Sequence, residues 1–442
     1  MTHQEKMNAI TTNIKKLALL KQPVKISKSV DSHFVPNPYD DRNKLPKADL
    51  SKLTEILEID PANMTCTAES GVTFNALVLE TLKHGLIPYT VPELKGITLG
   101  GAVSGCSIES MSYKYGGFHD SCIEYEIITG TGETMTCNPE HNSQIFDMIH
   151  GSYGTLGLLT KLKFRLLPAK PYVKMEYRKY PEFSSFWKEL KARCHAADYD
   201  FVDAIIHTPE EFVVCLGKMV DKVPYLSSYE WLNIFYKSTR EKSEDYMTIN
   251  QYFFRYDTEC HWLTKTVPLM ETKAARLILG KAILGSTNLI KWSKRIKHLM
   301  KLKRRPEVVV DVFIPSNKFE NFFGWYERDF DFFPLWIVPY KPPRAYPWID
   351  KEYAKRIDGE MFIDCAVYGK RNNDPKIDYS ELLEKKTVEM GGIKTLISRN
   401  HFNEEDFWKV YDKSSYTSVK RITDPNSMFM DLYKKFAPSN YA

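Results

Sequence analysis

The chain has 442 residues and a mass of 51.4 kDa, which is enough for two or three domains of ordinary size. Hydrophobic residues make up 43% of the chain and aromatic residues 13%, so a disordered or fibrous protein is excluded. The net charge of +5 is small for this length and spread along the chain, so we expect no nucleic-acid partner.

The cysteines and the N-terminal segment bear on compartment and cofactor class. The eight cysteines are scattered, without Cys-x-x-Cys or Cys/His spacing, which predicts reduced thiols and no metal site. The apolar stretch Leu17–Leu20 is too short for a secretory signal or a membrane span. We therefore expect a cytoplasmic protein, in which any membrane contact is peripheral.

The first part of the chain alternates strand and helix signals at short spacing. Apolar periodicity and turn residues predict a strand over Met64–Ala68, a helix over Val72–His84 that ends at Gly85, and strands over Ile123–Ile128, Thr134–Thr136 and Leu158–Leu167. This order is typical of an α+β domain with much antiparallel pairing. We place its end near Pro168–Pro171 and its extent at residues 20–170.

The rest of the chain is expected to form a second domain and a C-terminal segment. The patterns predict strands over Val308–Ile314, Leu335–Val338 and Met361–Val367, and helices over Phe402–Tyr411 and Met428–Phe436. We assign residues 171–385 to a mixed-sheet substrate domain, or cap, and residues 386–442 to a segment that packs back on the first domain.

A basic insertion over residues 276–305 interrupts the second domain. Residues 291–305 contain eight lysines and arginines and no acidic residue. On a helix, Trp292, Ile296, Leu299 and Met300 would share one face, which is typical of a helix that lies on a membrane surface. A solvated insertion without a membrane role is the alternative.

Glycines are densest over residues 91–119. Gly100 and Gly101 follow Thr98, and Gly105 lies four residues further on. Such spacing lets backbone N–H groups approach a phosphate without interference from Cβ atoms, although a glycine-rich bend in a sheet would give the same pattern. A second glycine element, Gly154–Leu158, directly precedes a predicted strand and favours a large cofactor laid across the domain.

The string Thr-Leu-Gly-Gly-Ala-Val-x-Gly-x-x-Ile-Glu-Ser, followed by Tyr-Gly and Gly-Thr-Leu-Gly, resembles FAD-linked oxidoreductases of the vanillyl-alcohol oxidase/PCMH type. Within them the chain is most similar to the Delta(24)-sterol reductase group and its bacterial relatives, including methylene fatty acyl reductases. The similarity extends over roughly residues 25–436 and includes the segments Ala169–Lys174, Ser243–Thr248, Tyr252–Asp257, Val310–Pro315 and Glu404–Trp408.

The resemblance implies a PCMH-type FAD-binding domain. The implied FAD contacts are Ser29, Ser32, Pro92, Thr98, Leu99, Gly100, Gly101, Ser104, Gly105, Ile108, Glu109, Ser110, Gly154, Thr155, Gly157 and Leu158. The family's first Arg-Gly-Gly-Ser loop is replaced by Lys28–His33, which offers hydroxyls and a cation instead. Glu109 and Ser110 occupy the region where oxidase members carry a flavin-linked histidine, so we expect non-covalent FAD.

The resemblance also implies an activity, which is reduction of an isolated C=C bond in a hydrophobic lipid, either a sterol side chain or a methylene fatty acyl chain. This chemistry needs a side-chain acid with a raised pKa in a dry pocket. The candidate catalytic residues are Glu109, Asp311, Tyr368, Lys370, Arg399 and His401. For Glu109 the alternative to a catalytic role is a structural one, as a carboxylate that caps the turn. A cation at Arg399 or His401 would stabilise the reduced flavin. His119 is expected to be structural.

Two other functions stay open. The same flavin domain is compatible with an oxidase or dehydrogenase of an alcohol or sugar-lipid, and a relative that lost FAD would be a lipid-binding protein without enzymatic activity. The chain contains no second dinucleotide motif. The electron donor is therefore expected to be either NADPH that docks transiently or another protein.

Overall fold

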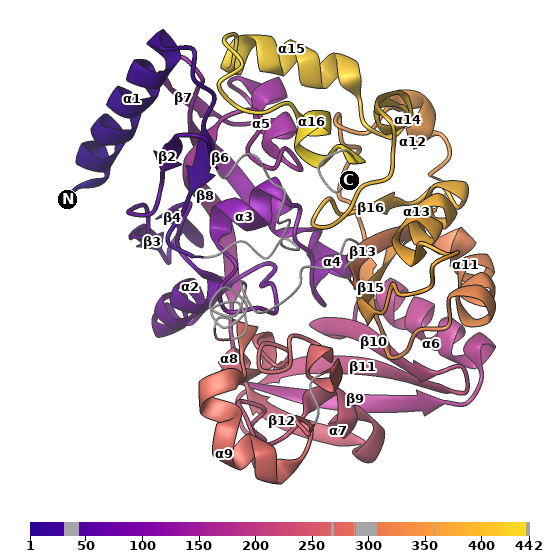
Figure 1. The fold of residues 1–442 in the computed structure, drawn as a ribbon. Helices are drawn as coiled ribbons and strands as arrows, with labels where there is room; N and C mark the ends of the chain where they lie inside the picture. The colour runs from indigo at the N-terminus through magenta and orange to yellow at the C-terminus, as the bar shows by residue number, and fades with distance from the viewer. Residues whose placement is uncertain (31–43, 267–268, 287, 289–306, 358, 439–442) are drawn as a thin grey trace.

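A computed structural model describes residues 1–30, 44–266, 269–286, 288, 307–357 and 359–438. Ser32 and the basic stretch over 291–305 lie outside the described residues. Figure 1 shows two sheets, with the N-terminal half of the chain around one and the central part around the other. Among the described residues, no helix has the length and apolar character needed to cross a membrane.

The first sheet forms the predicted N-terminal α+β domain, which we call the flavin domain. Its strand order is β3-β4-β8-β6-β7, and β5 also pairs with β8. The strands are β3 (Ile56–Asp60), β4 (Thr65–Glu69), β5 (Leu86–Pro88), β6 (Cys122–Ile128), β7 (Thr134–Cys137) and β8 (Leu158–Pro168). All the pairings in this sheet are antiparallel, as the sequence predicts for most of them.

Short helices cover this sheet. They are α2 (Phe74–Thr81), α3 (Leu99–Ser104) and α5 (Ser143–Ile149), whereas α4 (Ser112–Tyr115) packs against the strand over Leu335–Tyr340 of the second sheet. The predicted helix over Val72–His84 is confirmed as α2 with one further 3₁₀ turn, and Gly85 ends it with a φ of 67°. A left-handed residue at this position is the common end of a helix, and glycine adopts it without a Cβ penalty.

The sequence predicted neither the helix nor the short strand that the structure shows at the N-terminus. Helix α1 (His3–Leu19) starts with a capping box between Thr2 and Glu5 and buries Met7, Ile10, Ile14 and Leu17. The short strand β1 (Lys25–Ser27) pairs in parallel with β2 (Lys47–Asp49).

The second sheet has eight strands in the order β12-β9-β11-β10-β14-β15-β13-β16. They are β9 (Tyr172–Tyr180), β10 (Phe201–Thr208), β11 (Glu211–Val220), β12 (Glu244–Thr248), β13 (Val308–Pro315), β14 (Leu335–Tyr340), β15 (Phe362–Lys370) and β16 (Ile393–Lys394). Every neighbouring pair is antiparallel, which corrects the predicted mixed sheet. Periodicity within a strand carries no information on the direction of its partner.

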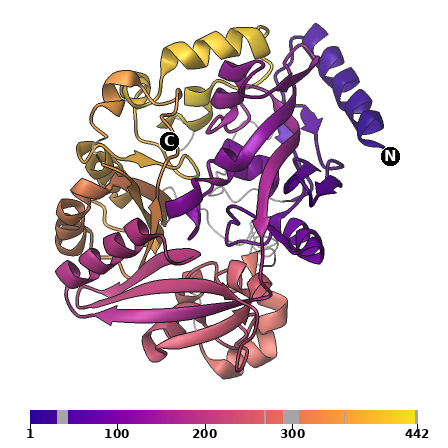
Figure 2. The ribbon, with the colours of Figure 1, turned by 180° about the vertical axis from the view of Figure 1, so that it is seen from behind.

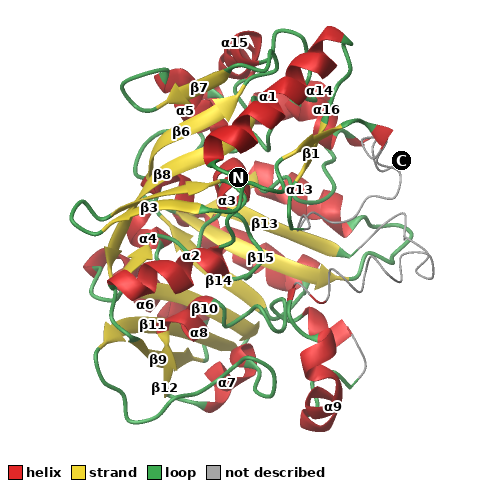
Figure 3. Ribbon diagram, turned by 90° about the vertical axis from the view of Figure 1, so that its left-hand side faces the viewer, coloured by secondary structure: helices red, strands yellow, loops and turns green. Residues whose placement is uncertain are grey.

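The helices of this domain are α6 (Phe183–Ala196), α7 (Phe235–Glu241), α8 (Ile249–Phe253), α9 (Lys273–Ile283), α11 (Phe319–Trp325), α12 (Lys351–Ala354) and α13 (Tyr379–Glu389). Helices α6, α11 and α13 cover one face of the sheet (Figure 1), and their apolar residues share a core with alternate residues of β13. Figure 3 shows strands β13, β15, β14, β10, β11 and β9 of this sheet in the order of their pairing, from top to bottom. The other face of the sheet is directed toward the flavin domain. On β13, Asp311 and Phe313 belong to that second face, because Val310 and Val312 belong to the first.

The domain boundary lies between the end of β8 at Pro168 and the start of β9 at Tyr172. The sheet continues to Lys394 in β16, which is beyond the predicted limit of 385. The remaining helices are α14 (Glu404–Val410), α15 (Lys413–Thr423), which was not predicted, and α16 (Leu432–Phe436), which is shorter than predicted because Asp431 caps its start.

The C-terminal segment lies beside the flavin domain, as predicted from the sequence (Figures 1 and 2). The Lys420 ammonium donates to the carbonyl of Thr155 at 2.6 Å, and the Val24 amide donates to the carbonyl of Met428 at 2.8 Å. These contacts join the C-terminal helices to the second glycine element and to the N-terminal strand β1.

Candidate functional site

The first glycine loop folds into α3, which starts at the N-cap Thr98. The Thr98 hydroxyl accepts a hydrogen bond from the Gly101 amide at 3.3 Å. A Cβ atom on Gly100 would lie 2.8 Å from Cβ of Ser70, so only glycine fits there. Leu99 is buried and holds the helix on the sheet, while Ser104 and Gly105 end it half-buried. The amides of Leu99 and Gly100 donate to the carbonyls of Val72 and Ser70, so they fix the shape of the loop, and the glycines leave the space beside it free of side chains. We call this glycine loop the cradle.

A cation lies beside this cradle. The Lys28 ammonium is 3.6 Å from the position of a Cβ on Gly101, and burial lowers its pKa. Among the described residues, no carboxylate pairs with Lys28. A half-buried ammonium beside these glycines, with no carboxylate partner in the described part of the chain, fits the diphosphate of a dinucleotide. The neighbouring Ser29 is exposed.

The second glycine element meets the first at β1. Gly154 has a φ of 74°, and a Cβ there would lie 2.5 Å from Ile26, two residues before Lys28. Thr155 and Leu158 are buried, and Gly157 packs against Ile127, so they shape the loop from inside. The structure therefore brings both glycine elements and Lys28 together, and these residues fit an FAD diphosphate.

The segments that flank α3 reach the domain interface. Pro92 precedes the loop and is buried, and Ile108 follows it and is half-buried. Glu109 and Ser110 are buried at the interface with the second sheet. The Ser110 hydroxyl lies 2.8 Å from the hydroxyl of Tyr252. Glu109 and Ser110 therefore contact the cap directly.

Glu109 belongs to a buried ionic network that spans the interface. Its Oε1 lies 2.9 Å from Nη2 of Arg255, and the same nitrogen lies 2.9 Å from Oδ2 of Asp203. The indole of Trp336 also donates to Asp203 at 2.8 Å. Burial raises the pKa of Glu109 to about 7, even though Arg255 lowers it. This network supports the structural role of Glu109, because it ties the end of the cofactor loop to the second sheet through Arg255 and Asp203.

Asp311 lies on the face of the sheet directed toward the flavin domain. The hydroxyl of Tyr368 donates a hydrogen bond to its Oδ1, and the hydroxyl of Thr395 lies 3.4 Å from its Oδ2. Burial raises the pKa of Asp311 to about 7, well above the ordinary value of a carboxyl group. Tyr368 and Asp311, which the sequence predicted separately, are therefore a bonded pair.

A cavity adjoins this pair and separates the two domains. It has an empty volume of about 600 Å³, part of it open to solvent, and it includes Phe313 and Thr395, the neighbours of Asp311. From the flavin domain it is lined by Gly105 and Cys106 at the end of the cofactor loop. Its aromatic lining consists of Tyr153, Phe313, Tyr340, Tyr346, Trp348, Phe362 and Tyr411.

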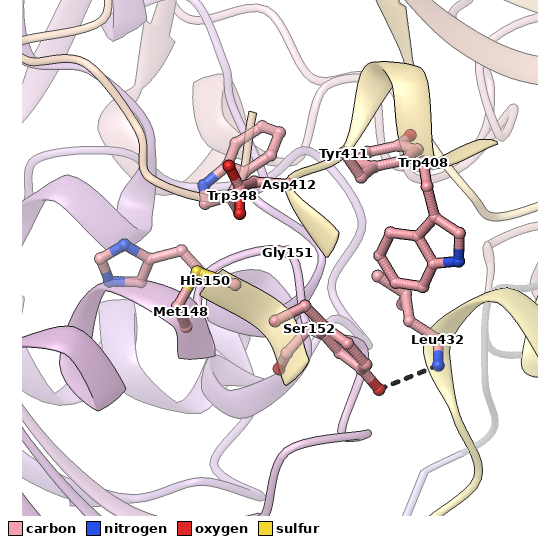
Figure 4. A pocket seen from close by; sticks show the side chains of 10 residues that line it. Met148, His150, Gly151, Ser152, Trp348, Trp408, Tyr411, Asp412 and Leu432 are labelled. Atoms are coloured by element: carbon pink, nitrogen blue, oxygen red, sulfur yellow. Dashed lines mark hydrogen bonds between the residues drawn. The ribbon is translucent and has the colours of Figure 1, made fainter. Parts of the chain in front are cut away.

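A smaller cavity of about 270 Å³ shares Gly151, Trp348 and Tyr411 with the first. Figure 4 shows it between the flavin domain and the C-terminal helices, with Trp408 and Trp348 in its lining. The aromatic surface therefore extends from the sheet to the C-terminal segment.

Three predicted catalytic residues lie elsewhere. Lys370 donates to the carbonyl of Phe330 at 2.6 Å, on the helix-covered side of the sheet. Arg399 pairs with Asp378 at the start of α13, and the His401 imidazole lies 3.0 Å from the Ser380 hydroxyl. Phe330 lies next to α11, and Asp378 and Ser380 lie at the start of α13. These partners hold the three residues away from Asp311, so the structure does not bring them to the site.

Sequence reasoning missed Glu93, His261 and Asp364. Glu93 Oε1 lies 3.1 Å from His261 Nε2, and the His261 ring contacts the Tyr368 ring at 4.5 Å between centroids. Asp364 is 2% exposed, and burial raises its pKa well above the ordinary value. Signals existed for all three: Glu93 lies in the glycine-dense stretch 91–119, Asp364 is an acid in a predicted apolar strand, and His261 follows the Tyr252–Asp257 segment of the resemblance.

His119 is buried, as expected for a structural residue, with Nε2 3.4 Å from the carboxylate of Asp120. No group of three or more metal-binding side chains occurs among the described residues.

Comparison with known proteins agrees with this geometry. A family model for the FAD binding domain matches residues 47–138, which include α3. A Delta(24)-sterol reductase of Macaca fascicularis is 26% identical over 410 residues, which cover 89% of this chain and 78% of that protein. The Delta(24)-sterol reductase of Pisum sativum is 24% identical and covers 88% and 76% of the two chains.

A more distant relative is cytokinin dehydrogenase 9 of Oryza sativa subsp. japonica, which is 22% identical over 81% of this chain and 70% of its own. The chain therefore carries a PCMH-type FAD-binding domain, and over most of its length it is a homologue of the Delta(24)-sterol reductases.

Proposed function

We propose that this protein reduces an isolated C=C bond in a hydrophobic lipid, with non-covalently bound FAD as its redox cofactor. The observation that carries the proposal is the position of Asp311, a carboxyl group with a pKa of about 7 beside an aromatic cavity. The cavity lies between the cofactor loop and the sheet, which suits a site where cofactor and apolar substrate meet. The names of the reductase relatives support the same assignment.

Reduction of an isolated alkene has a specific requirement for a proton. Bound FAD supplies a hydride equivalent, and the protein must supply the proton. Because no conjugated carbonyl can take up charge as an enolate, proton transfer must lead or accompany hydride addition, and positive charge develops on carbon. Aromatic faces such as those of Phe313 and Tyr340 stabilise a nearby cation.

Asp311 meets this requirement through its contacts. Tyr368 donates to Oδ1, so the proton of the neutral acid belongs on Oδ2, where Thr395 lies. With a pKa of about 7, Asp311 is mostly protonated below pH 7 and mostly ionised above it. We therefore expect reductase turnover to fall as the pH rises through 7, by about tenfold per pH unit once the acid is ionised.

The direct test measures the product. Purified protein with FAD is mixed under anaerobic conditions with NADPH or chemically reduced flavin, and with either a sterol that has a side-chain double bond or a methylene fatty acyl lipid. We expect a mass increase of two hydrogens in one of these lipids. An unchanged mass for both lipids, with the flavin reduced, would contradict the proposal.

Two alternatives are separated by the same preparation. An FAD-linked oxidase or dehydrogenase, which the name of the cytokinin dehydrogenase relative favours, would lose its flavin absorbance on addition of a substrate alcohol. A lipid-binding protein without activity would be isolated colourless and would not take up FAD.

The cofactor cradle gives a separate prediction. Replacing Lys28 by Met removes a half-buried cation beside Gly101, so we expect FAD affinity to fall by about tenfold or more. Thermal stability of the FAD-free protein should not fall, because desolvation of the Lys28 ammonium, which lowers its pKa, no longer opposes folding. The measurement is titration with FAD by flavin fluorescence, and Lys52→Met, at an exposed lysine of the same domain, is the matched control.

A further inference from the structure

Glu93 and His261 form a buried contact between the two domains that the mechanism above does not use. Glu93 belongs to the flavin domain and lies five residues before the N-cap Thr98, whereas His261 follows α8 in the cap. The two residues are 8% and 3% exposed, and Oε1 of Glu93 lies 3.1 Å from Nε2 of His261. A second bond runs beside it, from the Lys95 amide to Oδ1 of Asp257 at 2.8 Å.

The imidazole of His261 is held rigidly. Cys260 and His261 have φ values of 43° and 65°, in the left-handed region that residues other than glycine rarely adopt. The ring lies against Tyr256, Trp336 and Tyr368, with centroids 4.7, 4.9 and 4.5 Å away. The position of the ring that contacts Glu93 is therefore fixed by the surrounding cap.

The contact leads to the proposed acid. Tyr368, whose ring rests on His261, donates its hydroxyl proton to a hydrogen bond with Asp311. The titratable groups that face Asp311 or its partner come from four elements: Tyr368 and Asp364 from β15, Glu93 before α3, His261 after α8, and Tyr153 from the second glycine element. Of the two carboxyl groups among them, Glu93 has a lowered pKa and Asp364 a raised one, so ionisation of Asp311 places a like charge near that of Glu93.

We propose that Glu93, paired with His261 across the domain interface, is a positioning residue that keeps the Asp311 carboxyl protonated and able to donate. The role in catalysis rests on the proposed function, whereas control of the Asp311 proton is a property of the protein itself.

The electrostatics agree with this geometry. Burial raises the pKa of Glu93, but the hydrogen bond and charge of His261 lower it overall, so Glu93 carries a negative charge at neutral pH. Burial is the largest cause of the raised pKa of Asp311, and the Glu93 charge raises it further.

The test follows the Asp311 proton by infrared spectroscopy during a pH titration of the FAD-loaded protein. The protonated-carboxyl band that disappears in Asp311→Asn belongs to Asp311, and we expect its midpoint near pH 7. Glu93→Gln keeps an acceptor for His261 but removes the charge, so the midpoint should fall by about one pH unit. Glu58→Gln, at an exposed carboxylate of the same domain, is the control and should leave the midpoint of the Asp311 titration unchanged.

Turnover gives the second readout. If the midpoint falls by one unit, Glu93→Gln should reduce turnover about tenfold at pH 8 and hardly at pH 5, since Asp311 is protonated at pH 5 in both proteins. His261→Gln, which keeps a hydrogen-bond donor to Glu93 without a charge, should shift the midpoint in the same direction.

The outcomes separate the two claims. A midpoint that stays in place or rises in both variants, with FAD absorbance and melting temperature retained, overturns the inference. A midpoint that moves as expected in a protein that reduces neither lipid overturns the proposed function and leaves the control of Asp311 intact.

Discussion

Replacement of Asp311 by Asn should reduce lipid turnover by about 10²- to 10⁴-fold, which is the usual contribution of a general acid. Asn has nearly the same shape and can still accept a hydrogen bond from Tyr368, but its amide has no acidic proton to transfer to the substrate. We therefore expect the fall in kcat, with KM and the flavin absorbance almost unchanged. Steady-state kinetics with the reduced lipid quantified by mass spectrometry checks this result.

A matched control comes from the residues that the sequence proposed and the structure placed elsewhere. Lys370→Met removes a cation whose partner is the carbonyl of Phe330, on the far side of the sheet from the cavity, so it should leave turnover near the wild-type value. Equal losses in Asp311→Asn and Lys370→Met would contradict the assignment of Asp311.

The variant Asp311→Asn, which should lower turnover, should raise the stability of the folded protein. The folded-state pKa of Asp311 is raised to about 7 from an ordinary value of 3.8, so ionisation in the folded protein becomes increasingly unfavourable as the pH rises through this interval. Asp311→Asn removes this cost. We expect its melting temperature to exceed that of the wild type at pH 8 and the difference to shrink at pH 5.

The second large effect is expected at Arg255. This guanidinium is fully buried and neutralises both Glu109 and Asp203, so Arg255→Met leaves two carboxylates without a counter-ion. Removing one partner of a buried ion pair typically destabilises a protein by about 3–5 kcal/mol. We expect a loss of that size in chemical unfolding, together with loss of FAD, because Glu109 follows the cofactor loop directly.

A compensating variant decides whether the loss is electrostatic. Combining Arg255→Met with Glu109→Gln and Asp203→Asn removes the uncompensated charges, so most of the lost stability should return. If the triple variant is as unstable as Arg255→Met alone, the effect comes from packing of the arginine against Tyr252 and Tyr256 instead.

The sequence predicted the elements with strong local signals. The helix that ends at Gly85 and the strands around the first glycine loop follow from periodicity and turn chemistry, and they are where the structure has them. Helix α15 was missed although Asp412 caps it, because its polar face dominates its composition. The pairing of strands in the cap could not be predicted, since it depends on contacts between residues far apart in the chain.

The site, too, was predicted only where a local signal marks a residue. Asp311 was found because an acid in an otherwise apolar strand is unusual, and Tyr368 because it ends a neighbouring strand. The partnership of Glu93 with His261 joins residues 168 positions apart, which no local pattern indicates. Arg399 and His401 were placed near the flavin by the resemblance, but the acids of α13 hold them.

The chain crosses between the two domains twice, after β8 at Pro168 and again after β16 at Lys394. The cofactor-binding half is thus encoded by two separate stretches of the gene, with the whole cap inserted between them. A fragment cut at residue 170 would lack helices α14–α16 and expose the surface they cover, so it should aggregate. Chimaeras with other reductases should therefore exchange the intervening cap as a single cassette, from residue 171 to about 394.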